Sequence, residues 1–491
     1  MKKLIFSVGM IACLLFGLLL AGCADPEQPS AYVTGGEISV SGGKISGYCT
    51  DDGEVAVYKG IPYAAAPVGE LRWKAPQPVE PWEGVLDCTL WGANALQNDA
   101  SEFSYWTKEY IQDTDPTHYR DGIVYSEDCL NLNVWSSTDK YKNKPVLVFI
   151  HGGGYNSGGA SCDVYDGQSV AREDVVFVGI HYRVGVLGYL ATEALAAEEE
   201  KGAGNYGLLD QIAALRWVQE NIRTFGGDPG NVTVMGQSAG AGSVNALISS
   251  PLAEGLFVNA VSASHNSINR DWQTLDERIA QAPADLKDLT AEELRALPAS
   301  SLKGRTLSTG GHCVDGYALT GTYRETLLSG KANDVNLMTG MVAYDNLLSS
   351  VYSNASKGIT VGDSMIVLQN YVVQARRLGD YYGNAYVYFF DYNVPGNTPD
   401  TTGPYHTYDI PYFFGVFSAE RAEKWTQADR DLSRFMMGAL VSFCAQGAPQ
   451  TDPAWEASKG EYEYMNFNTA CSVKRLDAEK AAIVEEYYQL L

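Results

Sequence analysis

One serine of the chain stands in the pattern that a catalytic nucleophile requires. Ser238 is the centre of Gly236-Gln237-Ser238-Ala239-Gly240, a Gly-x-Ser-x-Gly sequence. The apolar run at 231–236 predicts a strand, and the small residues from Ala239 onward predict a helix. A sharp turn between such elements lifts the serine hydroxyl clear of the sheet, and the glycines avoid side-chain clashes. The pattern predicts an acyl-transfer nucleophile at Ser238; the alternative is an ordinary tight turn.

Acyl transfer also needs hydrogen-bond donors for the oxyanion of the tetrahedral intermediate. His151-Gly152-Gly153-Gly154 follows an apolar run at 146–150. Consecutive glycines leave their backbone N–H groups unshielded, so Gly153 and Gly154 suit this role. The N–H of Ala239, at the start of the predicted helix, supplies a third donor. The alternative for the glycines is a flexible turn.

The proton acceptor should be a histidine that follows the nucleophile in the chain. The histidines after Ser238 are His265, His312 and His406. His406 comes after a strand predicted at 385–390, in a loop that contains Gly403-Pro404. This placement favours His406 as the base, and the alternative is a surface loop histidine.

A carboxylate should orient the histidine. Asp345 follows the apolar run 335–338 and Gly340, so it should lie in a loop just past a strand. Asp315 and Asp391 are rivals that periodicity alone does not reject.

The elements that must position these residues alternate along the chain. Apolar runs at 146–150 and 175–180 are typical of strands covered on both faces, and a helix is predicted over 208–225. Strands that alternate with helices predict right-handed βαβ units and a mostly parallel central sheet. The expected fold class is therefore α/β, with one domain over residues 34–491.

The N-terminal segment predicts secretion and a lipid anchor. Lys2 and Lys3 precede an apolar run that Leu20-Ala21-Gly22-Cys23 closes with small residues. This ending resembles the lipobox of bacterial lipoproteins, in which the cysteine becomes the lipid-bearing N-terminus. We expect a signal peptide at 1–22, a lipid on Cys23 and a tether to residue 33, with the body on the extracytoplasmic side of a bacterial membrane. The alternative, a membrane helix, would need a longer apolar run.

Composition limits the partners. The 491 residues are 45% hydrophobic and 11% aromatic, which is ample material for a large core. The formal net charge is −24, and loss of Lys2 and Lys3 with the signal would make it −26. A protein with so large a negative charge repels phosphate backbones, which argues against nucleic acid as a partner.

The cysteines predict no zinc site and no dense disulfide framework. Nine cysteines are present, and none lies in a Cys-x-x-Cys pair. One or two bridges remain open among the cysteines outside the predicted signal and anchor, which are Cys49, Cys88, Cys129, Cys162, Cys313, Cys444 and Cys471.

Longer stretches of the chain resemble the type-B carboxylesterases, the family that includes the cholinesterases and bacterial para-nitrobenzyl esterases. The resemblance extends from about Thr34 to the C-terminus. It is carried by Lys59-Gly60-Ile61-Pro62-Tyr63-Ala64, Gly69-Glu70-Leu71-Arg72-Trp73, Ser126-Glu127-Asp128-Cys129-Leu130, His151-Gly152-Gly153-Gly154-Tyr155, and the stretches 205–211, 214–222 and 225–229.

The resemblance implies an α/β-hydrolase fold and a catalytic triad of Ser238, Asp345 and His406. The family's acid lies in a Gly-four-residues-acid loop, which corresponds to Gly340–Asp345, and its histidine precedes a run that corresponds to 409–415. The implied activity is hydrolysis of carboxylic esters, favouring small or short-chain ones, through an acyl-enzyme. No metal or organic cofactor is implied. The alternatives are a lipase acting on long-chain lipid esters and a non-catalytic surface binding protein of the same fold.

The chain departs from the family near the site. Gln237 stands where glutamate is usual, a position outside the triad, so we expect an effect on stability more than on activity. Asp345 is a shorter acid than the usual glutamate. His265 replaces the glycine usual after Ser264, which makes both residues tentative neighbours of the pocket; the alternative for His265 is packing or solvent exposure.

Two further departures concern the disulfide and the cap. Cys129 lies in the family's disulfide motif, but its usual partner position is occupied by Ala95, with Cys88 as a speculative substitute. Only 61 positions separate Asp345 from His406. The resemblance therefore implies a shortened helical cap, a wider gorge and a broader substrate range.

Overall fold

The computed structural model describes residues 34–98, 113–139, 143–198, 201–265, 272–307, 311–343, 384–392, 404, 406–417, 424–458 and 463–475. These residues belong to one compact unit, Val33–Leu491. Within these ranges, no helix has the length and apolar character needed to cross a membrane. The predicted signal peptide and Cys23 lie outside the described residues.

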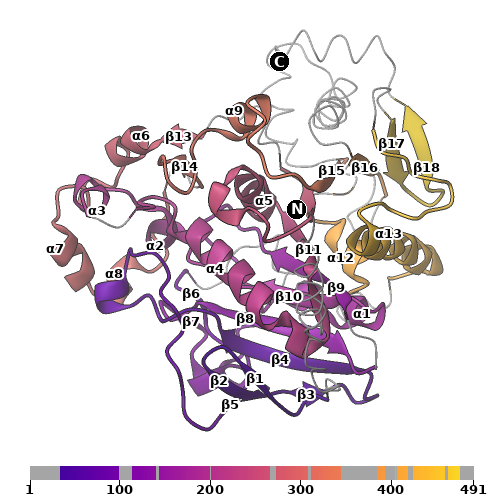
Figure 1. The fold of residues 1–491 in the computed structure, drawn as a ribbon, viewed down its shortest axis with the longest axis horizontal. Coiled ribbons are helices and arrows are strands. Elements are labelled where there is room, and N and C mark those ends of the chain that lie inside the picture. The colour runs from indigo at the N-terminus through magenta and orange to yellow at the C-terminus, as the bar shows by residue number, and fades with distance from the viewer. Residues whose placement is uncertain are drawn as a thin grey trace, which may run out of the picture. The chain divides into compact units, whose positions relative to one another are not determined.

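The centre of the fold is a sheet of 11 strands (Figure 1). Its strands are β3 (Tyr48–Cys49), β4 (Val55–Pro62), β8 (Asn131–Ser137), β9 (Lys144–Ile150), β10 (Val176–Ile180), β11 (Gly227–Gln237), β12 (Asn259–Ala263), β15 (Asn336–Val342), β16 (Ala385–Phe390), β17 (Glu463–Phe467) and β18 (Ser472–Arg475). Their order across the sheet is β18-β17-β16-β15-β12-β11-β9-β10-β8-β4-β3.

The middle of this sheet is parallel and its edges are antiparallel. All neighbouring pairs from β10 through β9, β11, β12, β15 and β16 to β17 are parallel. The pairs β10–β8, β8–β4, β4–β3 and β17–β18 are antiparallel. The sheet is thus mostly parallel at its centre, as the alternating sequence pattern predicted.

Smaller strands and the helices complete the described structure. The other strands are β1 (Glu37–Val40), β2 (Gly43–Ser46), β5 (Val85–Asp87), β6 (Asn94–Ala95), β7 (Tyr125–Ser126), β13 (Gln273–Thr274) and β14 (Cys313–Val314). The α-helices are α1 (Gln168–Arg172), α2 (Gly185–Tyr189), α3 (Glu193–Ala196), α4 (Tyr206–Asn221), α5 (Ala239–Ser249), α6 (Leu275–Ala280), α7 (Ala291–Ala296), α8 (Ala299–Leu302), α9 (Tyr323–Leu328), α12 (Ile410–Phe414) and α13 (Gln427–Gln446). The short 3₁₀ turns are η1 (Gly69–Leu71), η3 (Pro116–His118), η4 (Arg120–Gly122), η5 (Asp163–Tyr165), η6 (Ile222–Phe225) and η7 (Pro251–Ala253).

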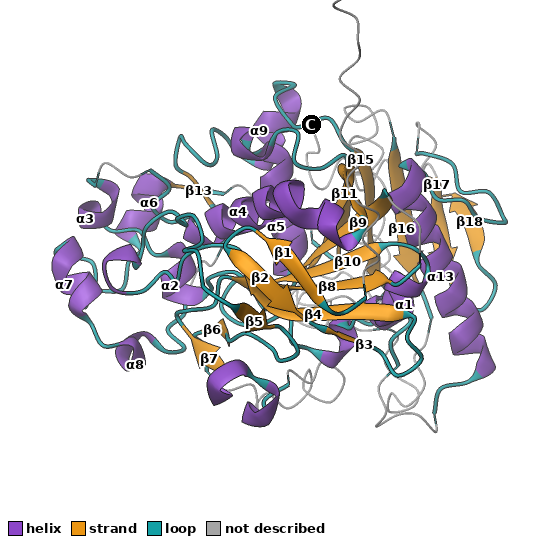
Figure 2. Ribbon diagram, turned by 60° about the horizontal axis from the view of Figure 1, so that its bottom comes forward, coloured by secondary structure: helices purple, strands orange, loops and turns teal. Residues whose placement is uncertain are grey.

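Both faces of the sheet are buried, because the alternating side chains of each strand enter two different cores. In β9, Val146, Val148 and Ile150 pack into one apolar cluster with α4 and α5. Leu147 and Phe149 pack into the other cluster with α1, α12 and α13. Figure 2 shows α4 and α5 on one side of the sheet and α1 and α13 on the other. This is the helix–sheet–helix layering of an α/β fold.

The sequence-predicted elements agree with the structure to within a few residues. The strands predicted at 146–150, 175–180 and 385–390 are β9, β10 and β16. The helix predicted over 208–225 is α4, whose last turn tightens into η6 before Gly226, which has φ 83°. A glycine in this left-handed conformation is a common helix end.

The topology brings the candidate site residues to one edge of the sheet. Parallel neighbours place their carboxyl ends together, and ligand sites of open α/β sheets form at that edge. Ser238 follows β11, Gly152 follows β9 and Ser264 follows β12. β15 ends at Val342, three positions before Asp345. Most of the segment from Asp345 to His406, which was predicted to form the shortened cap, lies outside the described residues.

The seven cysteines that remained open to pairing are all free thiols. Cys88 and Cys129 are both buried, but no disulfide joins them. Burial raises the pKa of the Cys88 thiol to about 12, although the nearby Arg120 opposes this shift. A thiol with so high a pKa is almost wholly protonated at neutral pH and is a poor nucleophile.

Candidate active site

Ser238 occupies a strained turn between β11 and α5. Its backbone has φ 58° and ψ −123°, and a positive φ is unusual for a residue other than glycine. The Ser238 N–H donates to the carbonyl oxygen of Ala263 at 2.9 Å, and the Ser238 carbonyl accepts from the N–H of Gly242 at 3.0 Å. Ser238 is partly exposed, whereas Gln237 and Ala239 on either side are buried. Its hydroxyl therefore stands at the edge of the sheet, as a nucleophile elbow requires.

The glycines on either side of Ser238 are required by close packing. A Cβ on Gly236 would come within 2.2 Å of the Gly240 carbonyl oxygen, and one on Gly240 within 2.0 Å of the Ile150 carbonyl oxygen. Both clashes would be with backbone atoms, which cannot move away as a flexible side chain can. The two glycines of the motif thus let the turn sit directly against the end of β9.

The glycine run after β9 lies beside the nucleophile. A Cβ on Gly152 would be 3.0 Å from Ser238 Cβ. Gly153 and Gly154 have φ of 110° and 62° and are exposed. The N–H of Ala239 opens α5, whose N-terminus carries positive dipole character. The structure thus places Gly152 against Ser238, while the assignment of Gly153, Gly154 and Ala239 to an oxyanion hole stays a prediction.

His151 supports this glycine run. Its Nδ1 lies 2.8 Å from the Gly152 carbonyl oxygen, which can only accept, so Nδ1 carries the proton. The ring stacks on Tyr182 at 4.4 Å between centroids, and the Tyr182 hydroxyl donates to the His151 carbonyl. Burial lowers the pKa of His151 to about 4, so the ring is neutral at physiological pH. This role was not predicted from the sequence, where the signal for it was a histidine directly before the glycines.

The structure places His406 against Gln237, the residue that precedes the candidate nucleophile. His406 is buried, in the turn that leads into α12, and its Nε2 lies 3.2 Å from the side-chain nitrogen of Gln237. Gln237 is the residue directly before Ser238, so the ring is at the edge where the elbow lies. From the sequence, Gln237 was a residue outside the triad, and its contact with His406 was not foreseen.

Asp345 lies outside the described residues, but its two rivals have other contacts. Asp315 Oδ1 accepts from the backbone N–H groups of Tyr317 and Leu319, as in a turn. Asp391 follows β16, and burial raises the pKa of its carboxyl, although Lys474 opposes the shift. A carboxylate that stabilises an imidazolium should instead favour its charged form. These surroundings favour neither Asp315 nor Asp391 as the acid of the triad.

His265 and Ser264 both lie close to the elbow. A Cβ on Gly242, one helical turn after Ser238, would be 2.8 Å from His265 Nε2 and 2.0 Å from the Tyr155 hydroxyl oxygen. Ser264 has φ 59°, and its N–H donates to the Gly340 carbonyl oxygen at 2.8 Å. His265 thus reaches the first turn of α5. Tyr155 belongs to the family motif but had no predicted role, and its contact with Gly242 places it near the site.

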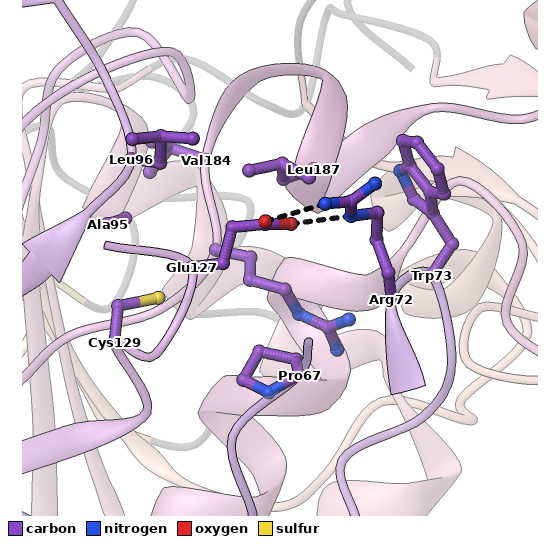
Figure 3. A pocket seen from close by; sticks show the side chains of 10 residues that line it. Pro67, Arg72, Trp73, Ala95, Leu96, Glu127, Cys129, Val184 and Leu187 are labelled. Atoms are coloured by element: carbon purple, nitrogen blue, oxygen red, sulfur yellow. Dashed lines mark hydrogen bonds and ion pairs between the residues drawn. The ribbon is translucent and has the colours of Figure 1, made fainter. Parts of the chain in front are cut away.

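The described residues also line a small cavity (Figure 3). It is bordered by the ion pair of Arg72 with Glu127, and by Cys129, and it has no space for a water molecule. None of its lining residues belongs to the candidate active site, so we assign it a structural role. In the same described ranges, no group of three or more His, Cys, Asp or Glu side chains could hold a metal ion.

Comparisons with known proteins agree with this arrangement. The sequence model of the Carboxylesterase family matches residues 35–366 and 359–484. The chain therefore belongs to the carboxylesterase family. The resemblance stated from the sequence motifs is confirmed.

Solved structures similar to this chain include two named PNB esterase. They superpose with TM-scores of 0.78 and 0.75 at 27% identity, over 92% of this chain and 99% and 100% of theirs. A Geobacillus stearothermophilus carboxylesterase has a TM-score of 0.72 at 27% identity, over 91% of this chain and 99% of its own. The α/β-hydrolase fold expected from the resemblance is confirmed.

Curated relatives match a shorter part of the chain. A Fumonisin B1 esterase of Sphingopyxis macrogoltabida is 36% identical over 307 residues, which is 59% of this chain and 53% of the relative. A medium-chain fatty acyl-CoA hydrolase precursor of Anas platyrhynchos is 41% identical over 57% of this chain and 47% of the relative. The matches thus span about half the length of these relatives.

Proposed function

We propose that this protein is a serine carboxylesterase that hydrolyses carboxylic esters through an acyl-enzyme on Ser238. The single observation that carries the proposal is the convergence at the elbow. Ser238 stands in a strained strand-to-helix turn, and Nε2 of His406 lies against Gln237, the preceding residue, although the two are 169 positions apart. Such convergence of a nucleophile and a histidine is what acyl transfer needs.

The proposed acylation step uses these groups. His406 takes the Ser238 proton at Nε2 as the hydroxyl oxygen attacks the ester carbonyl carbon. The N–H groups of Gly153, Gly154 and Ala239 stabilise the oxyanion, and removal of one such donor typically costs about 3 kcal/mol. The acyl carbon–oxygen bond then breaks, and the alcohol leaves with the proton that His406 returns. Asp345 holds the imidazole and stabilises its charged form.

Water completes the cycle. His406 removes a proton from water as the oxygen attacks the acyl-enzyme, and the collapse of the second intermediate returns that proton to Ser238. The products are one carboxylic acid and one alcohol for each water consumed. The nucleophile, the base, the acid and the oxyanion donors of this scheme are all residues of the chain.

Small or short-chain esters are the proposed substrates, with long-chain lipid esters as the alternative. Support comes from the PNB esterase structures, whose whole length this chain matches. A series of para-nitrophenyl esters from acetate to palmitate separates the two proposals. Values of kcat/KM should peak at short acyl chains, and a steady rise toward palmitate would favour the lipase.

The activity itself is tested with Ser238→Ala. The proposal expects a folded variant whose turnover of para-nitrophenyl butyrate falls by about ten-thousand-fold or more. Near-normal activity in this variant would contradict the assignment of Ser238. A wild-type protein with no activity on any ester of the series would favour the non-catalytic binding protein.

Attachment through a lipid on Cys23 is a further part of the proposal. Its support is the Leu-Ala-Gly-Cys sequence that ends the apolar run. A protein held this way faces the extracytoplasmic side of a bacterial membrane. In cells that express the full chain, Cys23→Ser should move the protein from the membrane fraction to the soluble one, and an unchanged distribution would contradict the anchor.

A further inference from the structure

Four lysine and arginine side chains are buried in the part of the chain that the structure describes, and one of them has no acidic partner. Arg72 pairs with Glu127, Arg183 with Asp210, and Lys144 with Asp139. Arg278, on α6, is only 2% exposed and makes no ion pair within the described ranges. Buried charges in proteins are normally paired, because removing an ion from water without compensation is costly.

The acidic neighbours of Arg278 on its own helix are turned away from it. The Glu277 side chain accepts from the N–H of Thr274 and closes the capping box of α6. Asp276 is exposed in the first turn. Neither residue enters the interior where the Arg278 side chain lies. The helix thus buries a cation while its own acids face solvent.

Most of the donor capacity of the guanidinium is unused. One nitrogen, Nη2, donates to the His312 carbonyl oxygen at 3.3 Å. Nε and Nη1 are buried and have no hydrogen-bond partner in the described structure. Burial lowers the pKa of Arg278, although Cys313, Tyr189 and Tyr155 oppose the shift. An arginine nonetheless remains protonated in proteins, so the positive charge persists.

Two more buried polar atoms without a partner belong to residues around this guanidinium. They are Nδ1 of His312 and the hydroxyl of Tyr189, whose rings lie 5.6 Å apart. Burial, with the charge of Arg278, lowers the pKa of His312 to about 3, so its imidazole is neutral. The guanidinium is therefore the charged member of a cluster of unsatisfied hydrogen-bonding groups, which we call the Arg278 cluster (Arg278, His312 and Tyr189). Such a concentration calls for an occupant, because native interiors satisfy most of their polar groups.

Tyr155 connects the Arg278 cluster to the nucleophile. Its ring lies 5.2 Å from that of His312 and 5.5 Å from that of Tyr189. Its hydroxyl lies over Gly242, whose N–H donates to the Ser238 carbonyl oxygen. His265 covers the same glycine and also influences His312 electrostatically. Tyr155 thus contacts the Arg278 cluster through its ring and the first turn of α5 through its hydroxyl.

We propose that Arg278 forms an anion subsite for a carboxylate on the ester substrate, so that the enzyme prefers half-esters of dicarboxylic acids or esters of hydroxy acids. This proposal rests on the proposed esterase function. Arginine suits the role because two N–H groups of its planar fork can bind one carboxylate. The carboxylate only binds; the ester bond is hydrolysed at Ser238 to acid and alcohol as before.

The test compares charged esters with uncharged esters of the same shape. Monomethyl adipate carries its carboxylate on the acid part, and 5-acetoxypentanoate carries it on the alcohol part; the control for each is its carboxamide. For at least one pair we expect the wild-type kcat/KM to favour the carboxylate by about tenfold or more, as charge-assisted hydrogen bonds allow. The pair that shows the preference identifies which part of the ester meets Arg278. Equal rates, or a preference for both amides, would overturn the proposal.

Arg278→Met removes the charge and keeps most of the side-chain length. The carboxylate-to-carboxamide ratio of kcat/KM should fall to about one in this variant. Arg216→Met, on the exposed side of α4, removes the same charge from the surface and should keep the wild-type ratio. If the ratio survives in Arg278→Met, or falls equally in Arg216→Met, the subsite is wrong.

A measurement on the unmodified protein keeps the proposal testable if Arg278→Met does not fold. Adipate should competitively inhibit hydrolysis of para-nitrophenyl butyrate at concentrations where adipamide does not. Equal inhibition by the two compounds would contradict a charge-selective subsite. Turnover of para-nitrophenyl butyrate without charge preference would leave the proposed function intact, whereas no turnover at all would refute the function itself.

Discussion

The side-chain nitrogen of Gln237 lies 3.2 Å from Nε2 of His406. An amide N–H can only donate, so Nε2 is the acceptor and the imidazole proton resides on Nδ1. This is the tautomer that a base needs if it is to take a proton at Nε2 while a carboxylate holds Nδ1. Gln237 therefore keeps the His406 imidazole in the tautomer that a base needs. Its amide N–H also occupies the Nε2 lone pair, which must accept the Ser238 proton during catalysis.

Gln237→Glu should change the pH dependence of hydrolysis. A carboxylate within 4 Å stabilises the imidazolium, so the pKa of His406 in the variant should rise by about one unit. Because the base must be neutral, the acid limb of the profile of kcat/KM against pH should move to higher pH. Gln237→Leu, which removes the hydrogen bond without adding a charge, is the control. An acid limb at the same pH in the Glu and Leu variants would contradict the contact.

The acid of the triad can be identified among three aspartates. Asp345→Asn should lower kcat by about ten-thousand-fold, because the imidazole loses its orientation and its countercharge. Asp315→Asn and Asp391→Asn, measured on the same ester, should stay within about tenfold of wild type because they alter a turn and a strand end. If Asp315→Asn or Asp391→Asn causes the large loss of kcat instead, Asp345 is not the acid of the triad.

Two glycine substitutions should have opposite effects on stability. Gly240→Ala would bring a Cβ within 2.0 Å of the Ile150 carbonyl oxygen, so it should destabilise the fold by about 1–3 kcal/mol and lower kcat. Gly438 lies inside α13, and a Cβ there would meet nothing within 4 Å beyond its own helix. Gly438→Ala should therefore stabilise by about 0.5–1 kcal/mol. Urea unfolding measures both, and a neutral Gly240→Ala would refute the packing of the elbow against β9.

Buried neutral histidines predict a loss of stability in mild acid. Burial lowers the pKa of His181 to about 3, and that of His151 to about 4. The unfolded state binds their protons from about pH 6.5 downward, whereas the folded state does not. Each ring should thus reduce the free energy of unfolding by about 1.4 kcal/mol per pH unit between pH 6 and its folded pKa.

The measurement for this prediction is the urea midpoint at pH 7, 6 and 5. In His181→Gln the free energy of unfolding should depend less steeply on pH than in wild type, because unfolding takes up about one proton fewer. His118 is exposed, so His118→Gln serves as the control and should keep the wild-type slope. Parallel curves for wild type and His181→Gln would contradict the burial of a neutral ring.

Local patterns were enough to predict the elbow and its strands. The apolar runs before Ser238 and Gly152 are continuous because β11 and β9 are buried on both faces, and glycines mark the places where the backbone turns sharply or packs closely. The chain order and loop placement favoured His406 as the base, and the family resemblance selected it over a surface loop histidine; a turn before α12 places it beside Gln237. The contact itself was not predictable from local patterns, because it joins residues 169 positions apart.

The Arg278 cluster was not predictable from the sequence. Leu275-Asp276-Glu277-Arg278 has the composition of an exposed helix, and acids adjacent to an arginine indicate a solvated ion pair. The capping box uses Glu277 at the helix start, and the arginine turns inward instead. Burial of one side chain on a short helix depends on tertiary packing, for which a single sequence carries no periodic signal.

The most direct test of Ser238 as the nucleophile is to locate the covalent adduct of a fluorophosphonate with the wild-type protein. This reagent mimics the tetrahedral intermediate and reacts with an activated serine. Peptide mass spectrometry should find one stoichiometric adduct, on Ser238, and an excess of a hydrolysable ester should slow its formation. A stoichiometric adduct on another residue, or no adduct in a folded protein, would contradict the assignment on which the proposed mechanism depends.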